Sequence, residues 1–151
     1  MENIYLKEFQ GVKYRTMLVR EDASVSPGPL KRAELVYQYI RSGLENRDQE
    51  CFVSILFNSQ MVPLGVSLVS VGRLNCATVE PREVFKTAII ASAASLIVAH
   101  NHPSGDCKPS QDDIHITTSL KEAGDMLQIP ILDHIIVGRD CFYSMKEHEE
   151  I

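Results

Sequence analysis

Two histidines and an aspartate lie close together in this 151-residue sequence, in a pattern that suits a metal ion. His100 and His102 follow the apolar run 95–99 at a spacing of two, and extended backbone points such residues to the same face. Asp113 comes after a loop that contains Pro and Gly, in the first turn of an expected helix, from which its carboxylate can turn back toward the histidines. Two imidazoles and one carboxylate, with a fourth position left for water, are the ligands of a catalytic zinc site.

Each part of this pattern also has a purely structural interpretation. The two histidines could belong to a polar loop beside the turn at 103–105. Ser110 and Asp113 resemble a capping box, in which an N-cap hydroxyl and an acid three residues later bond the start of a helix. All of these features fall between His100 and Asp113, and their coincidence favours the metal site.

A hydrolytic zinc site needs a general base for its water, and that base should lie outside the ligand loop. Glu50 begins the apolar run 50–57, and a carboxylate at the end of a strand can reach a metal-bound water. Spacing alone gives equal weight to the alternative that Glu50 is the last solvated residue before the strand. Glu80 and Glu83 are rivals, because the helix dipole favours acids where a helix begins.

Apolar periodicity predicts the elements that position these residues. Helices are expected at 30–44, 81–93 and 110–127. Strands are expected at 50–57, 61–71, 95–99, 129–137 and 141–145, with a bend or bulge at Gly65. The inward face of the third helix is expected to carry Ile114, Leu120, Ala123 and Leu127. This alternation predicts an α/β fold with a mixed sheet and helices on both faces.

One clear break in composition, at 23–29, is typical of a loop. It ends an N-terminal arm at 1–29, and the main domain is expected at 30–151. Within the arm, alternating residues suggest one strand at 12–18.

The overall composition excludes several classes of protein. The chain has 15 Lys+Arg, 20 Asp+Glu, a formal net charge of −5 and 44% hydrophobic residues. The hydrophobic fraction excludes wholesale disorder, and the acidic balance lacks the basic footprint of a duplex-binding protein. No apolar run reaches the roughly 20 residues of a membrane span, and the N-terminus does not resemble a signal peptide. We therefore expect a cytoplasmic protein with free thiols at Cys51, Cys76, Cys107 and Cys141.

The segment from His100 to Asp113, with the pattern H-x-H-P-x6-S-x2-D, resembles the complete signature of the JAMM (MPN+) zinc metalloproteases. That signature also includes an upstream glutamate at the start of an apolar strand, the place that Glu50 occupies. Stretches that resemble the RadC branch of this superfamily lie at 81–84, 99–105, 109–110 and 132–138. The resemblance covers about residues 30–145.

This resemblance implies an MPN fold akin to that of the cytidine deaminases, a three-layer arrangement with a mixed sheet between helices. It implies one zinc ion per chain, bound by His100, His102 and Asp113, with water as the fourth ligand. Glu50 would act as general base and then protonate the leaving amine, and Ser110 would stabilise the oxyanion. The implied activity is that of a metallopeptidase or isopeptidase acting on a peptide or protein substrate.

Two departures from the family bear on this reading. Full-length RadC proteins carry a DNA-binding helix-hairpin-helix module before this domain, and the N-terminal arm shows no such pattern. Glu80 stands where RadC relatives usually have a histidine before Pro-Arg-Glu. An alternative function is that of a RadC-like DNA-repair or mobile-element-associated binding protein with an idle metal site, in which nucleic-acid contact is suggested by family association alone.

The remaining polar residues are interpreted as structural. Cys107 is expected to be an exposed loop residue, rather than a ligand or a redox switch of the metal site. Asp133 and His134 are adjacent on a strand and therefore face opposite sides, which favours a structural role for the pair. His115 and His148 are expected on the surface.

Overall fold

The structure, a computed structural model, describes residues 26–72 and 79–151. The expected strand at 12–18 and Cys76 lie outside the described residues. The helices are α1 (Ala33–Leu44), α2 (Pro81–Ile90) and α3 (Gln111–Leu127). The strands are β1 (Cys51–Phe57), β2 (Pro63–Val71), β3 (Ser95–Asn101), β4 (Ile131–Val137) and β5 (Phe142–Ser144).

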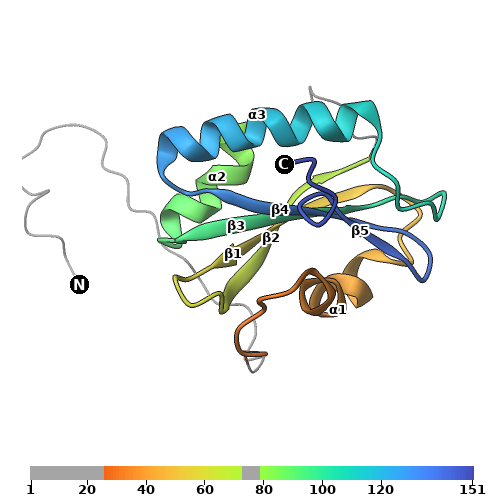
Figure 1. Cartoon of the computed structure of the whole chain (residues 1–151), viewed down its shortest axis with the longest axis horizontal. Coiled ribbons are helices and arrows are strands. Elements are labelled where there is room, and N and C mark those ends of the chain that lie inside the picture. The colour runs from red at the N-terminus through yellow and green to blue at the C-terminus, as the bar shows by residue number, and fades with distance from the viewer. Residues whose placement is uncertain (1–25, 73–78) are drawn as a thin grey trace, which may run out of the picture.

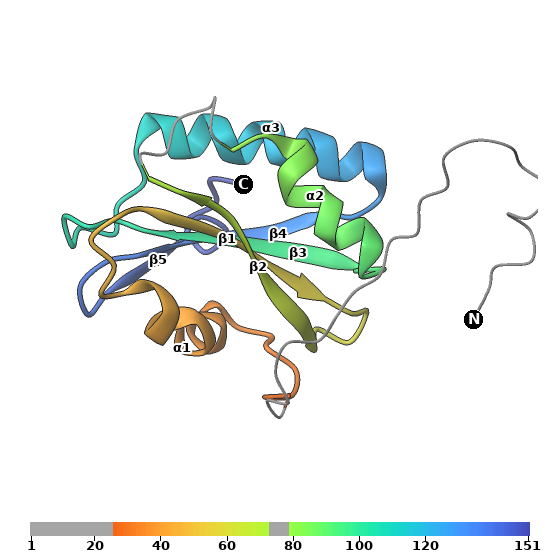
Figure 2. The same ribbon diagram turned by 180° about the vertical axis from the view of Figure 1, so that it is seen from behind.

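The strands form one mixed sheet in the order β2-β1-β3-β4-β5. β1 pairs antiparallel with both β2 and β3, and β4 pairs antiparallel with β5. The parallel pair is β3 and β4, and α3 forms the crossover that such a pair requires. Figure 1 and the view from behind in Figure 2 show α1 on one face of the sheet and α2 and α3 on the other. The predicted α/β fold, with a mixed sheet between helices, is confirmed.

Strand boundaries differ from the predicted ones for identifiable reasons. β3 continues two residues beyond the apolar run, because His100 still pairs with Phe52 on β1 and with Ile136 on β4. β4 begins only at Ile131, since Pro130 lacks the N–H that an interior strand donates. The first histidine of the motif is therefore part of the central strand rather than of the loop.

Two other expected features can be compared with the structure. The irregularity expected at Gly65 is present as a shift in pairing, because Leu56 pairs with Gly65 whereas its neighbour Phe57 pairs with Pro63. α2 begins at Pro81 as predicted but ends at Ile90, three residues earlier than the expected 93.

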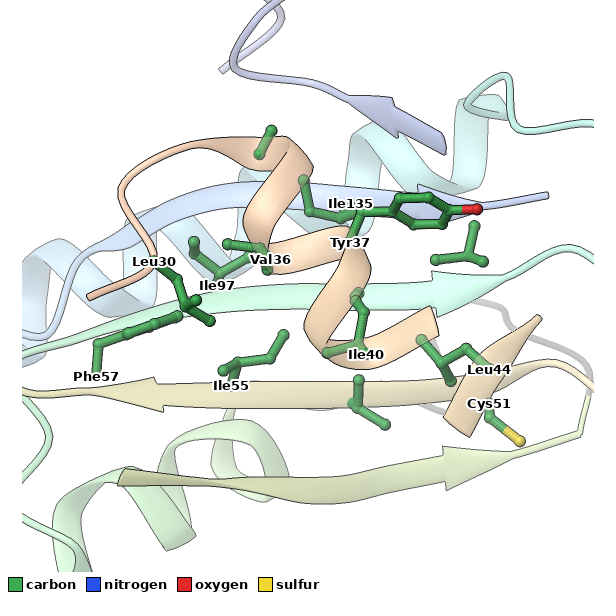
Figure 3. Packing of buried hydrophobic residues seen from close by; sticks show 14 residues of the cluster. Leu30, Val36, Tyr37, Ile40, Leu44, Cys51, Ile55, Phe57, Ile97 and Ile135 are labelled. Carbon is green, nitrogen blue, oxygen red and sulfur yellow. The ribbon is translucent and has the colours of Figure 1, made fainter. Parts of the chain in front are cut away.

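Hydrophobic side chains pack on both faces of the sheet. Figure 3 shows the first cluster, which joins α1 to the sheet. Its labelled members are Leu30, Val36, Tyr37, Ile40, Leu44, Cys51, Ile55, Phe57, Ile97 and Ile135. The second cluster lies on the opposite face and includes Phe52, Leu96 and Leu120. β1 and β3 are buried along their whole length, which explains why their sequences are apolar without alternation.

The buried face of α3 is not the one that apolar periodicity predicted. Leu120 is buried as expected, but Leu127 is exposed and Ile114 and Ala123 are only half-buried. The buried residues are Asp113, Ile116, Thr117, Leu120 and Gly124. The prediction failed because two inward positions carry polar side chains, and hydrophobicity alone assigns such residues to solvent.

None of the helices in residues 26–72 and 79–151 is both long enough and apolar enough to cross a membrane.

Candidate metal centre

The candidate ligands come from the end of β3 and the start of α3. His100 lies opposite Phe52, so its side chain projects on the face of the sheet that α2 and α3 cover. His102 follows the strand, and its N–H donates to the carbonyl of Val137 at 2.9 Å, which extends the parallel pairing. Asp113 lies in the first turn of α3 and is buried. The expectation that the two imidazoles converge and that the Asp113 carboxylate turns back toward them is confirmed.

The three side chains meet at one point. Nε2 of His100 lies 2.9 Å from Nε2 of His102 and 3.1 Å from Oδ1 of Asp113. Nε2 of His102 lies 3.4 Å from Oδ2 of Asp113. The ligand atoms all lie within 4.8 Å of one another. Zinc bonds of about 2.0–2.2 Å in a tetrahedron place ligand atoms about 3.3–3.6 Å apart, a spacing that falls within the 4.8 Å that encloses this group.

The outer nitrogen of each imidazole has a partner of its own. Nδ1 of His102 lies 2.8 Å from the backbone oxygen of Asp106, and a carbonyl can only accept, so the proton of a neutral His102 lies on Nδ1. Nδ1 of His100 lies 2.8 Å from Nε2 of His134. Both Nε2 atoms therefore face the Asp113 carboxylate while the Nδ1 atoms are bonded outward. Second partners of this kind orient metal-binding histidines.

The centre contains a buried negative charge, on the Asp113 carboxylate, which a nearby positive charge would stabilise. Burial opposes ionisation of Asp113, but the contacts of its carboxylate with the imidazoles of His100 and His102 prevail and hold the pKa of this carboxyl well below its usual range. The hydrogen bond that protonated His102 donates to Asp113 raises the pKa of His102 against the effect of burial, and the Glu50 charge adds to this shift. A proton on His102 can balance the carboxylate, and a divalent cation would do so more completely. These residues thus fit a metal ion.

Ser110 and Asp113 form the capping box that the sequence suggested. The same Asp113 carboxylate belongs to the candidate metal centre, so the two interpretations are compatible. Oγ of Ser110 accepts from the N–H of Asp113 at 3.2 Å. The N–H and the hydroxyl of Ser110 each donate to Oδ2 of Asp113 at 2.7 Å. The capping box therefore holds the Asp113 carboxylate with Oδ1 toward His100 and directs the Ser110 hydroxyl to Oδ2.

Pairing of the strands brings Glu50 to the centre. Glu50 stands two residues before Phe52, which pairs antiparallel with His100, so the same register places Glu50 beside His102. It is half-buried, and its charge contributes to the raised pKa of His102. The rivals Glu80 and Glu83 lie at the start of α2 in ion pairs, with Arg82 and Lys86 respectively. The role of Glu50 as general base stays a prediction.

Two residues lie behind the centre: His134, for which the sequence favoured a structural role, and Thr117, which the sequence analysis did not single out. Nε2 of the fully buried His134 contacts His100, and its Nδ1 lies 2.6 Å from Oγ1 of Thr117. Burial disfavours the charged form of His134 and holds its pKa well below the usual value. Local patterning carries no signal for this contact, because only the pairing of β4 parallel beside β3 places His134 opposite Val98, on the same face as His100.

Asp133, by contrast, has the structural role that was expected. Its carboxylate accepts from the hydroxyl of Ser144 at 2.6 Å and from the N–H of Lys146 at 3.0 Å. Burial raises the pKa of Asp133, although these hydrogen bonds oppose the shift. The residue ties β4 to β5 and to the turn after it.

The other interpreted residues lie outside the centre. Cys107 is half-buried rather than exposed, and burial together with its contact with Cys141 raises its pKa to about 11. Cys107 is not among the side chains that converge at the centre, which are His100, His102 and Asp113. His115 and His148 are exposed, as predicted.

A mixed sheet between helices, with two histidines at the end of a central strand and an acid at the start of the next helix, defines a domain with a candidate metal centre. Over residues 30–150 the chain matches the RadC-like JAB domain, and it belongs to this family. The predicted resemblance to the RadC branch is thereby confirmed.

The chain is also similar to bacterial proteins named UPF0758 protein. It is 48% identical over 109 residues to one from Rubrobacter xylanophilus, a match that covers 72% of this chain and 48% of the relative. It is 46% identical over 136 residues to one from Shouchella clausii, a match that covers 90% of this chain and 56% of the relative. The chain spans about half the length of the curated relatives it matches.

Proposed function

We propose that this chain is a zinc-dependent hydrolase of the JAMM type, a metallopeptidase or isopeptidase that cleaves an amide bond in a peptide or protein substrate. The observation that carries the proposal is the convergence of His100, His102 and Asp113, with ligand atoms within 4.8 Å. Nδ1 of each histidine is bonded outward, which leaves Nε2 toward the carboxylate. The two imidazoles and the carboxylate suit zinc best among the common divalent ions, although affinity alone does not select it.

Zinc bound by these residues would lower the pKa of its water toward about 7 and polarise the scissile carbonyl. The Glu50 carboxylate would accept a proton from water at the centre and later deliver it to the leaving nitrogen. Its place beside His102, inferred from the β1–β3 register, supports this role. The partial exposure of His102, whose side chain is 15% accessible, gives the centre a side open to solvent and substrate.

Ser110 would stabilise the oxyanion. Its Oγ stays in place by accepting the N–H of Asp113, while its hydroxyl hydrogen turns from Oδ2 of Asp113 toward the substrate. Loss of one such donor lowers turnover by about 10²–10³-fold in enzymes where it has been measured.

Elemental analysis of the purified chain beside His102→Ala tests the metal centre first. We expect about one zinc per chain in the wild type and a loss of most of it in the variant, because His102 supplies one of the three protein ligands. No zinc in the wild type, even after zinc addition and removal of the excess, would sink the proposal.

Glu50→Gln then tests the chemistry, with Glu83→Gln as a matched control on the rival acid. Zinc-loaded proteins are assayed on a fluorogenic peptide library and on lysine-isopeptide substrates. We expect Glu50→Gln to retain zinc and lose hydrolysis, and Glu83→Gln to retain both. Equal turnover in Glu50→Gln and wild type rejects the role of Glu50. Zinc binding without hydrolysis of any substrate in the panel would count against the peptidase assignment and in favour of a binding protein.

A further inference from the structure

Behind His100 lies a buried pair, Thr117 on α3 and His134 on β4, that the proposed chemistry does not use. We propose that Thr117 and His134 are positioning residues, which hold the proton of His100 on Nδ1 and so leave its Nε2 free to bind the metal ion. This inference rests on the metal-binding part of the proposed function and does not depend on hydrolysis.

The direction of these hydrogen bonds follows from the backbone oxygen of Asp113, which the Thr117 hydroxyl contacts. Oγ1 of Thr117 lies 2.6 Å from the backbone oxygen of Asp113, which can only accept, so the hydroxyl proton is donated there. The sulfur of Met145, at 3.5 Å, is a weaker and more distant acceptor for the same proton. Since Thr117 has a single hydroxyl proton, its contact of 2.6 Å with Nδ1 of His134 requires the proton of that bond to lie on His134.

The proton of His134 in turn decides the state of His100. A neutral His134 with its proton on Nδ1 has a bare Nε2, which accepts from Nδ1 of His100 at 2.8 Å. His100 then has a bare Nε2, the atom that faces His102 and Asp113. A backbone carbonyl of the first turn of α3 thus selects the metal-binding tautomer of His100 through two intervening side chains.

Thr117, His134 and His100 form a hydrogen-bonded relay that is shielded from solvent, so water does not compete for its hydrogen bonds. Thr117 and His134 are 0% exposed and His100 is 1% exposed. In the part of the chain that the structure describes, Ser54 Oγ is the one buried side-chain polar atom without a hydrogen-bond partner, so the relay atoms are all satisfied. If His134 instead carried its proton on Nε2, it would donate to His100, whose own proton would then occupy the ligand nitrogen.

The tautomers can be measured without any substitution. Long-range ¹H–¹⁵N correlation spectra of the zinc-free wild-type protein at pH 8 distinguish protonated from bare ring nitrogens. We expect both His100 and His134 to carry the proton on Nδ1, and His134 to keep it there after zinc is added. A proton on Nε2 of His134 in the folded protein would overturn the proposal. This result stands whether or not the protein hydrolyses anything.

Thr117→Val and Thr117→Ser form a matched pair, because valine keeps the shape of threonine and serine keeps the hydroxyl. The readouts are the zinc dissociation constant, from competition with a chromophoric chelator, and the His134 tautomer. We expect Thr117→Val to bind zinc about 10- to 100-fold more weakly and to populate the Nε2 proton of His134, and Thr117→Ser to resemble the wild type in both.

Two outcomes separate this inference from the proposed function. A folded Thr117→Val that binds zinc as tightly as Thr117→Ser, with an unchanged His134 tautomer, refutes the positioning role while the metal centre stands. A wild type with the expected tautomers that binds no zinc refutes the proposed function while the relay stands. Circular dichroism of the zinc-free proteins reports folding, and the wild-type spectra decide the proposal if Thr117→Val does not fold.

Discussion

The Ser110→Ala variant separates the structural from the chemical role of one side chain. Alanine removes the acceptor for the N–H of Asp113, a cap loss that costs about 0.5–2 kcal/mol. It also removes the hydroxyl that donates to Oδ2 of Asp113, a hydrogen bond to a charged group of a kind worth about 1.5–3 kcal/mol when it is not replaced.

The second loss is mostly compensated. Ser110 is exposed, so water can take the place of its hydroxyl, and its backbone N–H still donates to the same oxygen at 2.7 Å. We therefore expect the free energy of unfolding of the zinc-free protein to fall by about 1–2 kcal/mol in total. For a chain of this size that corresponds to a decrease of about 2–8 °C in Tm.

Denaturant unfolding of zinc-free wild type, Ser110→Ala and Ser110→Thr measures this effect, since threonine keeps both the acceptor and the donor. We expect Ser110→Thr to remain within about 0.5 kcal/mol of the wild type. An unfolding free energy for Ser110→Ala equal to that of the wild type would refute the argument that the capping box stabilises α3. With a substrate in hand, a loss of turnover far larger than the loss of stability would support the oxyanion role.

Two further predictions concern the pH dependence of zinc binding and the packing of α3. The raised pKa of His102 means that protons compete with zinc at a higher pH than at an ordinary histidine, so zinc affinity should fall as pH is lowered from 8 to 5.5. In the zinc-free protein, the raised pKa of His102 also increases the free energy of unfolding. This contribution is fully present below the unfolded pKa of about 6.5 and is lost as pH rises through the higher folded pKa. Zinc affinity independent of pH over this range would contradict the assignment of His102 as a ligand. Gly124→Ala should destabilise the fold by about 1–3 kcal/mol, because its Cβ would lie 2.7 Å from the backbone oxygen of Ile129. The matched control is Gly43→Ala on α1, which should be neutral or stabilising because nothing lies within 4 Å of the added Cβ. Equal unfolding free energies for the two alanine variants would refute the close approach of α3 to the loop before β4.

The amino-acid sequence alone predicted the order of the helices and strands and the three candidate metal ligands. The spacing of His100 and His102 places both on one face once the chain is extended. The short loop between β3 and α3 keeps Asp113 close to them. These are relations between residues near one another in the chain, and local periodicity and turn chemistry report such relations directly. The apolar runs of β1 and β3 likewise predicted strands buried on both faces.

Tertiary structure alone decided which residues distant in the sequence lie near the candidate centre. His134 lies 34 positions from His100 and 17 from Thr117, and Glu50 reaches His102 through the register of two antiparallel strands. Thr117 lies on a face that hydrophobicity assigned to solvent, and it is buried because its hydroxyl has two partners within 2.6 Å. Hydrophobic patterning describes one element at a time, whereas a buried polar group is stabilised by partners that only the packing of several elements supplies.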